Sequence, residues 1–338
     1  MNLKNWKSWL MAGVLMSTVT ACSTSGSGDN TGESNYPKKP ITVVAPSGAG
    51  GGWDLTARSL TKVLGETKLV DQTMTVENKP GGGGAVYLAE YATQYKKDDY
   101  KLFISSPPIL INNLKKEGNS PYGYKDTTPL AQLTKDFGAI VVKADSKYNS
   151  LKELMDAVKN DPKSVTAAGG SAPGSMDHLV AVLPAYKSGV DPKTVKYVSY
   201  DGGGEAIAAL LGGNADYIAT DASAVGEFLK AGKVKVLGVS STERLKGDLA
   251  DVPTFKEEGI DTDFTIWRGV FGPKEMSNNA KKYWSKKLEN LNDSQEWKDE
   301  LKRNGWEEEY KSADDFSSFL KEQEKQVEDL LKSLGMNK

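Results

Sequence analysis

The sequence predicts an α/β fold in two lobes, and three observations support this prediction. Short apolar runs typical of buried strands alternate with helical patterns along most of the chain. Loops rich in glycine or serine repeatedly follow the predicted strands. These units form two sets, one before about Asp136 and one from about Gly138 to Val239. We therefore expect a ligand cleft between two lobes, with a hinge that allows the cleft to close.

The first unit is a strand, a glycine loop and a helix. Ile41–Ala45 is a β-branched apolar run that predicts a buried strand. Residues 47–52 follow as a loop with four glycines, and a helical pattern begins at Trp53, with Asp54 placed to cap its start. The start of a helix carries free N–H groups and the positive end of the helix dipole. The loop is therefore predicted to receive an anion.

A second unit repeats this pattern. It consists of a strand, an Asn-Lys-Pro turn, a loop of consecutive glycines and a helix, at residues 74–77, 78–80, 81–84 and 85–95. Loops at the carboxyl ends of neighbouring strands would converge on one crevice. Neither loop is a nucleotide-binding motif, because the first lacks a Gly-Lys-Ser/Thr ending and has Trp53 where a third glycine belongs. The alternative is that the glycines only make tight turns.

The rest of the chain continues the alternation. Lys101–Ser105 predicts a third strand, and Ser106 with two prolines follows at its carboxyl end. Further strands are predicted at residues 139–142, 164–168, 195–200, 217–220 and 234–240, and helices at residues 150–160, 176–187, 205–211 and 225–231. The pattern in residues 254–338 predicts amphipathic helices apart from a strand at residues 265–271. If this tail packs on the first set of strands, the chain crosses between the lobes twice.

The composition argues against several classes of function. The chain has 338 residues and a formal net charge of −2, which gives no indication of a nucleic-acid partner. With one cysteine and one histidine, a Cys/His zinc site is nearly excluded, and we expect no metal site. A Ser-His-Asp triad would have to use His178, and no G-x-S-x-G motif is present. An enzyme acting on a small anion would have no candidate residue beyond His178 and scattered acids.

The first residues predict an exported lipoprotein. Lys4 and Lys7 precede a mostly apolar run of thirteen residues, 9–21, which is too short for a resident membrane span but typical of an export signal. Residues 19–22 (Val-Thr-Ala-Cys) resemble a lipobox, in which cleavage precedes Cys22 and the thiol carries acyl chains such as palmitate. A buried cysteine, or ordinary secretion with cleavage nearby, is the alternative.

We therefore expect a signal peptide over residues 1–21 and a flexible tether over residues 22–35, where Ser, Gly and Asn dominate. Two acyl chains are sufficient for stable anchoring. Everything from Tyr36 onward is then expected at the extracytoplasmic face of the cell membrane. The polar tether and the many lysines favour a Gram-positive surface over a periplasm, and both remain open.

Several stretches resemble the extracytoplasmic solute receptors of the tripartite tricarboxylate transporter system, the TctC or Bug family. The strongest markers are the GGGWD and ENKPGGGG loops at residues 50–54 and 77–84. Weaker matches are the start Tyr-Pro-x-x-Pro-Ile-Thr, the strand and loop from Tyr197, the Leu-Leu-Gly-Gly turn and the Asp-Val-Pro-Thr segment, at residues 36–42, 197–203, 210–213 and 251–254. The resemblance covers about residues 36–275.

The resemblance implies a type II periplasmic-binding-protein fold, a Venus flytrap whose two α/β lobes are joined by crossing strands. On this chain, residues 36–136 plus 241–338 would form lobe 1 and residues 137–240 lobe 2. The resemblance also implies a receptor without catalysis or cofactor. Such a receptor delivers a small organic carboxylate to the integral-membrane permease subunits of the transporter.

The resemblance also implies where the ligand binds. Main-chain amides and ordered waters near the first two glycine loops would hold one carboxylate, and the opposite lobe would supply small hydroxyl residues. The matching positions are Ser47, Gly50, Gly51, Gly52, Trp53, Asp54, Asn78, Gly81, Gly82, Gly83, Gly84, Ser171, Gly174, Ser175, Tyr200, Gly202, Gly203, Asp221 and Ser223.

Three further candidates come from side-chain chemistry. Ser105 and Ser106 are possible hydroxyl donors, and Arg268 is the best candidate for a charged clamp, because a guanidinium suits a carboxylate. Structural alternatives stay open: Asp54 as a helix cap, Trp53 as a core residue and Arg268 in a surface salt bridge.

Two departures from the family pattern concern charge. Many relatives carry Lys after the Tyr where this chain has Asp201, and a Thr/Ser-Thr-His-Leu run where this chain has Ser-Met-Asp-His-Leu at residues 175–179. If Asp201 points into the cleft, it disfavours a polyanion or selects a ligand with an amino group. The alternative is a side chain that faces solvent.

The sequence as a whole predicts a lipid-anchored receptor for a small organic carboxylate, and the GGGWD loop favours tricarboxylates such as citrate. A dicarboxylate, amino-acid or aromatic-acid receptor is the runner-up among binding proteins. An extracytoplasmic enzyme acting on a small anion is the rival from another class. A purely structural surface lipoprotein would not explain glycine loops at successive strand ends.

Overall fold

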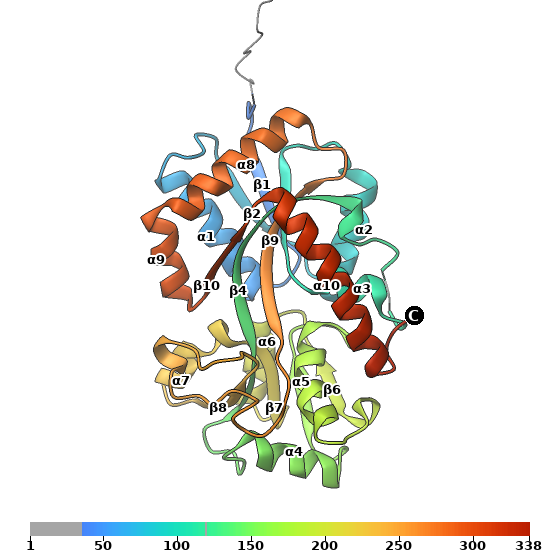
Figure 1. Cartoon of the computed structure of the whole chain (residues 1–338). Helices are drawn as coiled ribbons and strands as arrows, with labels where there is room; N and C mark the ends of the chain where they lie inside the picture. Colours follow the sequence, from blue (N-terminus) through green and yellow to red (C-terminus); the bar gives the residue numbers. More distant parts are fainter. Residues whose placement is uncertain (1–35, 119) are drawn as a thin grey trace, which may run out of the picture. The chain divides into compact units, whose positions relative to one another are not determined.

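Two long strands, β4 and β9, connect the halves of the molecule. The structure, a computed structural model, describes residues 36–118 and 120–338, and in it β4 (Thr127–Lys143) is 17 residues long. The first part of β4 pairs antiparallel with β9 (Thr265–Pro273) and β10 (Glu307–Lys311), and its second part with β7 (Tyr217–Asp221) and β8 (Val234–Val239). Figure 1 shows β4 and β9 running side by side. One strand thus belongs to both halves.

The strands form a mixed sheet with the order β2-β1-β3-β9-β4-β7-β5-β6, and β8 and β10 also pair with β4. The parallel strands β1 (Ile41–Ala45), β2 (Met74–Asn78) and β3 (Lys101–Ser105) belong to what we call the first lobe. The parallel strands β5 (Thr166–Gly169), β6 (Lys196–Ser199) and β7 belong to the second lobe. The predicted two-lobed α/β fold is confirmed.

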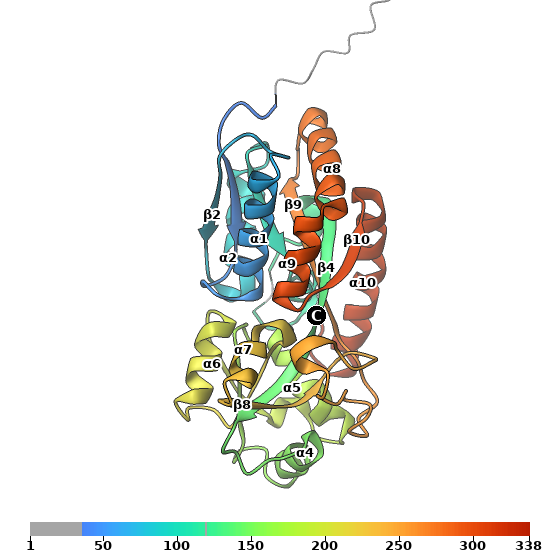
Figure 2. The ribbon, with the colours of Figure 1, turned by 90° about the vertical axis from the view of Figure 1, so that its left-hand side faces the viewer.

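Helices surround both groups of strands (Figure 2). Those of the first lobe are α1 (Gly52–Glu66), α2 (Ala85–Gln94), α3 (Pro108–Leu114), α8 (Asn278–Asp293), α9 (Gln295–Asn304) and α10 (Ala313–Ser333). Those of the second lobe are α4 (Leu151–Asn160), α5 (Met176–Lys187), α6 (Gly203–Leu211) and the short α7 (Gly226–Lys230). Short 3₁₀ helices are Gly82–Gly84, Tyr124–Asp126, Pro192–Thr194, Ala222–Ala224 and Gly247–Leu249.

Apolar side chains cover both faces of the sheet. In β1, Ile41 and Val43 pack in a cluster with α1, α8 and α9, whereas Val44 packs in a second cluster with α2, α3 and α10. In β3, Leu102 joins the first cluster and Phe103 the second. Successive side chains of a strand point to opposite faces. Because helices cover both faces, these strands are continuous apolar runs in the sequence rather than alternating patterns.

Three elements differ from the sequence prediction. The tail also contains β10, where only helices and one strand were expected. The sequence did not indicate this strand because EEEYK is charged and has no buried position. β4 begins at Thr127, whereas the sequence predicted a strand only from residue 139. The first part of β4 was missed because Pro129 and two register shifts interrupt its apolar pattern. α3 starts at Pro108, where no helix was predicted, and proline suits the first position of a helix.

Two predictions are not settled by the fold. The signal peptide and tether predicted over residues 1–35 lie outside the described residues. The predicted lobe boundary at residues 136–137 falls inside β4 and stays a prediction. Among residues 36–118 and 120–338, no helix combines the length and the apolarity needed to cross a bilayer.

Gly269 in β9 packs closely against α10, and this contact gives a test of the fold. A Cβ atom at this position would lie 2.4 Å from the buried ring of Phe316. We expect Gly269→Ala to lower the free energy of unfolding by about 1–3 kcal/mol through overpacking, measured by urea denaturation. The control is Gly65→Ala in α1, where a Cβ would meet nothing within 4 Å. Equal stability of the two variants would contradict the packing described here.

Candidate ligand-binding site

A cavity of about 270 Å³ lies between the two lobes. Its lining comes from the loops that follow β1, β2 and β3 in the first lobe, from the loops after β5, β6 and β7 in the second, and from β9. Carboxyl ends of parallel strands from both lobes therefore meet at one place, as the sequence predicted. The volume lies near the lower end of ordinary small-molecule sites, so a ligand of few atoms fits it.

The start of α1 forms one wall of the cavity. Gly51 is the N-cap residue, and Gly51, Gly52 and Trp53 all line the cavity. N–H groups in the first turn of a helix have no partner inside the helix. The indole Nε1–H of Trp53 donates to Ser106 Oγ at 2.8 Å, which fixes the ring beside the loop. This wall therefore offers main-chain donors and an aromatic side.

Asp54 does not line the cavity but holds the glycine loop in place through hydrogen bonds. Its carboxylate accepts the Gly50 N–H at 2.9 Å, an N–H of Asn78 at 2.9 Å and the Nε–H of Arg58 at 3.0 Å. The expected N-cap role is wrong, because the cap is Gly51 and Asp54 lies inside the first turn. Burial alone would raise the pKa of Asp54, but the hydrogen bonds from Arg58, Gly50 and Asn78 outweigh it and hold that pKa below its usual range.

The second glycine loop forms the neighbouring wall. Gly81, Gly82, Gly83 and Gly84 have φ angles of 139°, 57°, 63° and 87°, a region that residues with a side chain rarely adopt. The first three line the cavity. The side-chain amide of Asn112 donates to Gly83 O at 2.9 Å and holds the turn in place. The consecutive glycines are thus required by the backbone conformation.

In the second lobe, the starts of α5 and α6 face the cavity. A Cβ on Gly170 would lie 2.3 Å from the backbone of Gly202 and Gly203, so the loop after β5 packs directly on the start of α6. The Asp177 N–H donates to Ser171 Oγ at 2.8 Å, and Asp177 Oδ2 accepts the Gly170 N–H at 2.6 Å. The loop after β5 is therefore closed by a residue of the helix that follows it.

The two lobes touch at the cavity. The Gly48 N–H of the first lobe donates to Asp201 O of the second at 3.2 Å. A Cβ on Gly51 would lie 3.9 Å from the Gly203 nitrogen, so the starts of α1 and α6 stand close together. Lys115 donates to Pro173 O at 3.1 Å on another side. A small anion between α1 and α6 could accept hydrogen bonds from both lobes at once.

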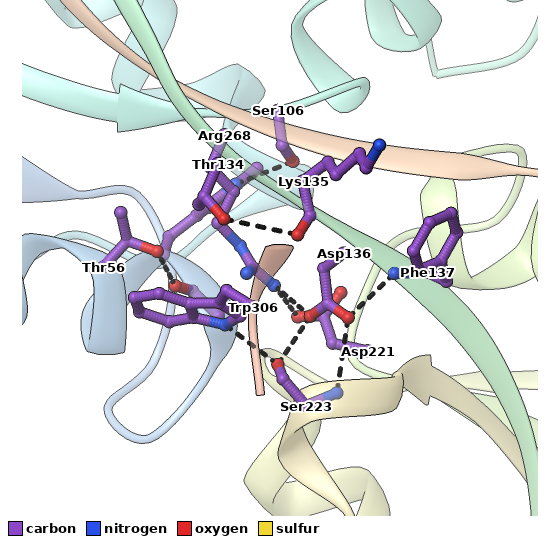
Figure 3. Close-up of polar contacts among 12 residues, drawn as sticks. Thr56, Ser106, Thr134, Lys135, Asp136, Phe137, Asp221, Ser223, Arg268 and Trp306 are labelled. Atoms are coloured by element: carbon purple, nitrogen blue, oxygen red, sulfur yellow. Dashed lines mark hydrogen bonds and ion pairs between the residues drawn. The ribbon is translucent and has the colours of Figure 1, made fainter. Parts of the chain in front are cut away.

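A buried ion network lies beside these helix starts (Figure 3). The Nη2 of Arg268, a fully buried residue, is 3.0 Å from Asp136 Oδ2 and 2.9 Å from Asp221 Oδ2. The Ser223 hydroxyl donates to Asp136 at 2.5 Å and accepts from Trp306 Nε1 at 3.1 Å. Arg268 Nε and Nη1 have no hydrogen-bond partner among the described residues. The guanidinium therefore forms ion pairs with two carboxylates, and its Nε and Nη1 N–H groups remain available to a ligand.

Fourteen of the predicted ligand contacts line the cavity. They are Ser47, Gly51, Gly52, Trp53, Gly81, Gly82, Gly83, Ser106, Ser171, Tyr200, Gly202, Gly203, Asp221 and Arg268. The others do not: Gly50, Asp54, Asn78, Gly84, Ser105, Gly174, Ser175 and Ser223 are outside its lining. Gly84 and Ser105 line a smaller neighbouring cavity instead. The sequence thus predicted the loops that line the cavity, but not which of their residues contribute to the lining.

Several lining residues were not predicted, and Asp177 is the most informative of them. Others are Gly170, Met176, Ser199, Thr220, Ala224 and Ile266. Asp177 was noted only as a departure from the family pattern, although an acid in the first turn after a glycine loop was a usable signal. Asp201, the other departure, lines the cavity while its residue as a whole is exposed.

The titration of Asp177 and of its neighbour His178 is shifted in opposite senses. Burial, with Asp221 nearby, raises the pKa of Asp177 to about 8. Burial, with Lys115 nearby, lowers the pKa of His178 to about 4. His178 Nδ1 accepts the Gly174 N–H at 2.8 Å, and its ring packs 4.6 Å from that of Tyr197. His178 does not line the cavity, so this geometry gives it a structural part.

The arrangement contains no metal site that we can identify. In the part of the chain that the structure describes, no group of three or more His, Cys, Asp or Glu side chains is placed to hold a metal ion. What the cavity offers is hydrogen-bond donors from helix starts, a partly committed guanidinium and buried carboxylates. These are the elements of a binding site for a small polar ligand.

The sequence matches a known protein family. The model of the "Tripartite tricarboxylate transporter family receptor" matches residues 57–336. The UPF0065 protein in the gbd 5′ region of Cupriavidus necator is 28% identical over 306 residues, which is 90% of this chain and 90% of that protein.

Solved structures show the same fold. The periplasmic binding protein BugD is similar with a TM-score of 0.80 and 26% identity, over 89% of this chain and 99% of that one. MatC from Rhodopseudomonas palustris with bound malate has a TM-score of 0.77 and 23% identity, over 88% of this chain and 100% of that one.

The raised pKa of Asp177 predicts how stability changes with pH. The folded state keeps a proton up to about pH 8 that the unfolded chain loses near 3.8, so the free energy of unfolding falls as the pH rises through this range. His178 has the opposite effect, because its pKa falls from 6.5 to about 4 on folding. Its contribution is complete above pH 6.5, so Asp177 dominates between pH 6.5 and 8.

Asp177→Asn should flatten this dependence. Between pH 6.5 and 8 the wild type is expected to lose up to about 2 kcal/mol more stability than the variant, at about 1.4 kcal/mol for each pH unit. Urea denaturation at the two pH values measures the difference. Asparagine can still accept the Gly170 N–H, so folding is preserved. Parallel losses in both proteins would show that Asp177 is ionised in the folded state.

Proposed function

The chain belongs to the tripartite tricarboxylate transporter receptor family, and we propose that it captures one small organic carboxylate between its lobes and delivers it to the permease of such a transporter. Its family and its structural relatives are substrate-binding proteins and not enzymes, so the rival prediction of an enzyme is set aside. The receptor family acts outside the cytoplasm, and we assign the chain to the extracytoplasmic side.

One observation carries the proposal: the starts of α1 and α6, from different lobes, stand together at a cavity of about 270 Å³. Each start supplies N–H groups that no helical carbonyl can accept. Beside them, Arg268 has buried Nε and Nη1 donors without a hydrogen-bond partner in residues 36–118 and 120–338. A carboxylate in this place would accept hydrogen bonds from both lobes and stabilise the closed arrangement.

The structure of MatC with bound malate provides a precedent of the same fold for a small acid. The cavity volume favours a ligand of this size over a large aromatic acid. The predicted lobes, residues 36–136 plus 241–338 and residues 137–240, would close on the ligand about β4 and β9. The crossing of the chain in these two strands supports that hinge.

We further propose that Cys22 is the lipid anchor and that residues 1–21 are removed on export. The support is the sequence alone, because these residues lie outside the described part of the chain. The transporter family to which the chain belongs supports the proposed delivery to permease subunits. An anchored receptor stays close to its permease, which shortens the search after ligand capture.

A thermal-shift screen against organic acids tests the receptor function. A ligand that binds only the folded state at 100 times its Kd adds about 2.7 kcal/mol to stability, so at least one acid should raise the melting temperature by several degrees. No response to any acid would refute carboxylate capture.

Gly52→Ala shows whether the hit binds at the helix starts. A Cβ there would lie 2.3 Å from Asp221 Oδ2 and 2.5 Å from Arg268 Nη2, so the lobes could not approach as they do. We expect at least a tenfold weaker affinity, or about 1.4 kcal/mol, by calorimetric titration. Gly65→Ala, the same change at the other end of α1, should bind like the wild type. Unchanged binding by Gly52→Ala would place the ligand elsewhere.

Cys22→Ser tests the anchor. The lipobox cannot be acylated without its thiol, so the variant should move from the membrane fraction to the soluble extracytoplasmic fraction. Cell fractionation with immunodetection measures the distribution, and metabolic labelling with palmitate should mark the wild type only. Retention of the variant in washed membranes would show that another element holds the protein there.

A further inference from the structure

The second-lobe side of the cavity is acidic. Asp177 and Asp221 both line the cavity, and the two residues are only 4% and 8% exposed. Asp136 lies next to Asp221 on the same guanidinium and is 2% exposed. Among the described residues, Arg268 is the only Lys or Arg in the lining. The carboxylates of Asp136 and Asp221 therefore share the single cation of Arg268, and Asp177 is a third acidic side chain beside them.

Asp221 has a carboxylate oxygen to which no group in the described part of the chain donates. Its Oδ2 is 2.9 Å from Arg268 Nη2, while its buried Oδ1 has no hydrogen-bond partner among the described residues. Leaving a buried carboxylate oxygen without a donor is costly. Because Asp221 lines the cavity, a donor on the ligand can supply the missing hydrogen bond.

Asp177 is the second acceptor on this wall. The only hydrogen bond that its carboxyl receives from the described main chain is the one from Gly170 N–H to Oδ2. Burial keeps the pKa of this group near 8, so it holds a proton that it can release when a cation arrives. A ligand with a second carboxylate would instead bring a like charge against Asp221 and Asp136, which disfavours it.

We propose that the ligand carries a protonated amino group beside its carboxylate, and that Asp221 and Asp177 bind this amino group. This inference rests on the proposed function, in which the helix starts of α1 and α6 hold the carboxylate. The receptor then selects a small amino acid over a dicarboxylate or tricarboxylate. On binding, Asp221 replaces water as the hydrogen-bond partner of the ammonium group. A zwitterion suits this site because the helix starts donate hydrogen bonds to its carboxylate and the acidic side chains accept them from its amino group.

The geometry also limits the ligand's shape. Gly52 of α1 lies so close to Asp221 that a Cβ on Gly52 would be 2.3 Å from Oδ2. The donors for the carboxylate and the acceptor for the amine are therefore neighbours. The amino group must stand on a carbon close to the carboxylate, as in α- and β-amino acids.

Matched ligand pairs test the proposal on the full chain by calorimetric titration. The pairs are L-alanine with propionate, L-aspartate with succinate, and L-glutamate with glutarate, and citrate is added as a polyanion. We expect at least one amino acid to bind at least tenfold tighter than its deaminated partner, and citrate to bind more weakly than that amino acid. If a deaminated acid or citrate binds as tightly as every amino acid, the amino-group inference is overturned while the carboxylate receptor stands. If no acid in the wider screen binds, the receptor function itself fails.

Two isosteric variants locate the amino group. Asp221→Asn and Asp177→Asn should each weaken binding of the preferred amino acid at least tenfold and leave the affinity for its deaminated partner unchanged or higher. Should Asp221→Asn not fold because Arg268 loses a partner, Asp177→Asn still decides. Asp156→Asn on the exposed surface of α4 removes the same charge and should change neither affinity. An equal loss for both ligands in Asp177→Asn would assign it a structural part and overturn its contact with the amine.

Discussion

The architecture of the cleft depends on one buried cation. Arg268 of β9 is held between Asp136 of β4 and the carboxylate of Asp221 at the end of β7. A guanidinium without water must have such partners, since an unpaired buried charge is strongly destabilising. These partners come from the strand shared by both lobes and from the second lobe. The pairing therefore fixes where the second lobe stands relative to α1, and Gly52 fits against it only because glycine has no side chain.

Around this ion network, the walls of the cavity have different chemistry. The first lobe contributes helix starts and glycine turns, whose donors belong to the main chain. The second lobe contributes another helix start, at Gly202 and Gly203, together with the acidic side chains of Asp177 and Asp221. Main-chain donors can recognise any carboxylate, because they touch only its oxygens. Discrimination among acids then falls to the side chains that meet the remainder of the molecule.

The sequence predicts the loops better than it predicts individual side chains. Of the glycines predicted at residues 81–84, the first three line the cavity, and all four have the positive φ angles that favour glycine. Arg268 was predicted as a candidate clamp and does line the cavity, but its pairing with Asp136 was not predicted, because that pairing depends on the register between β4 and β9. Asp54 was read as a cap and in fact holds Gly50 from behind. β10 was missed, because a charged edge strand has neither an apolar run nor an alternating pattern.

The proposed binding of the carboxylate by peptide N–H groups of α1 and α6 has an evolutionary consequence. A mutation replaces a side chain and leaves the amide in place, so the anchor for the carboxylate survives most changes in sequence. Lining residues such as Met176, Thr220 and Ile266 can then vary one at a time. Under the proposed function, each step would alter which acid is preferred without abolishing binding, so a lineage can move from one acid to another through intermediates that remain functional.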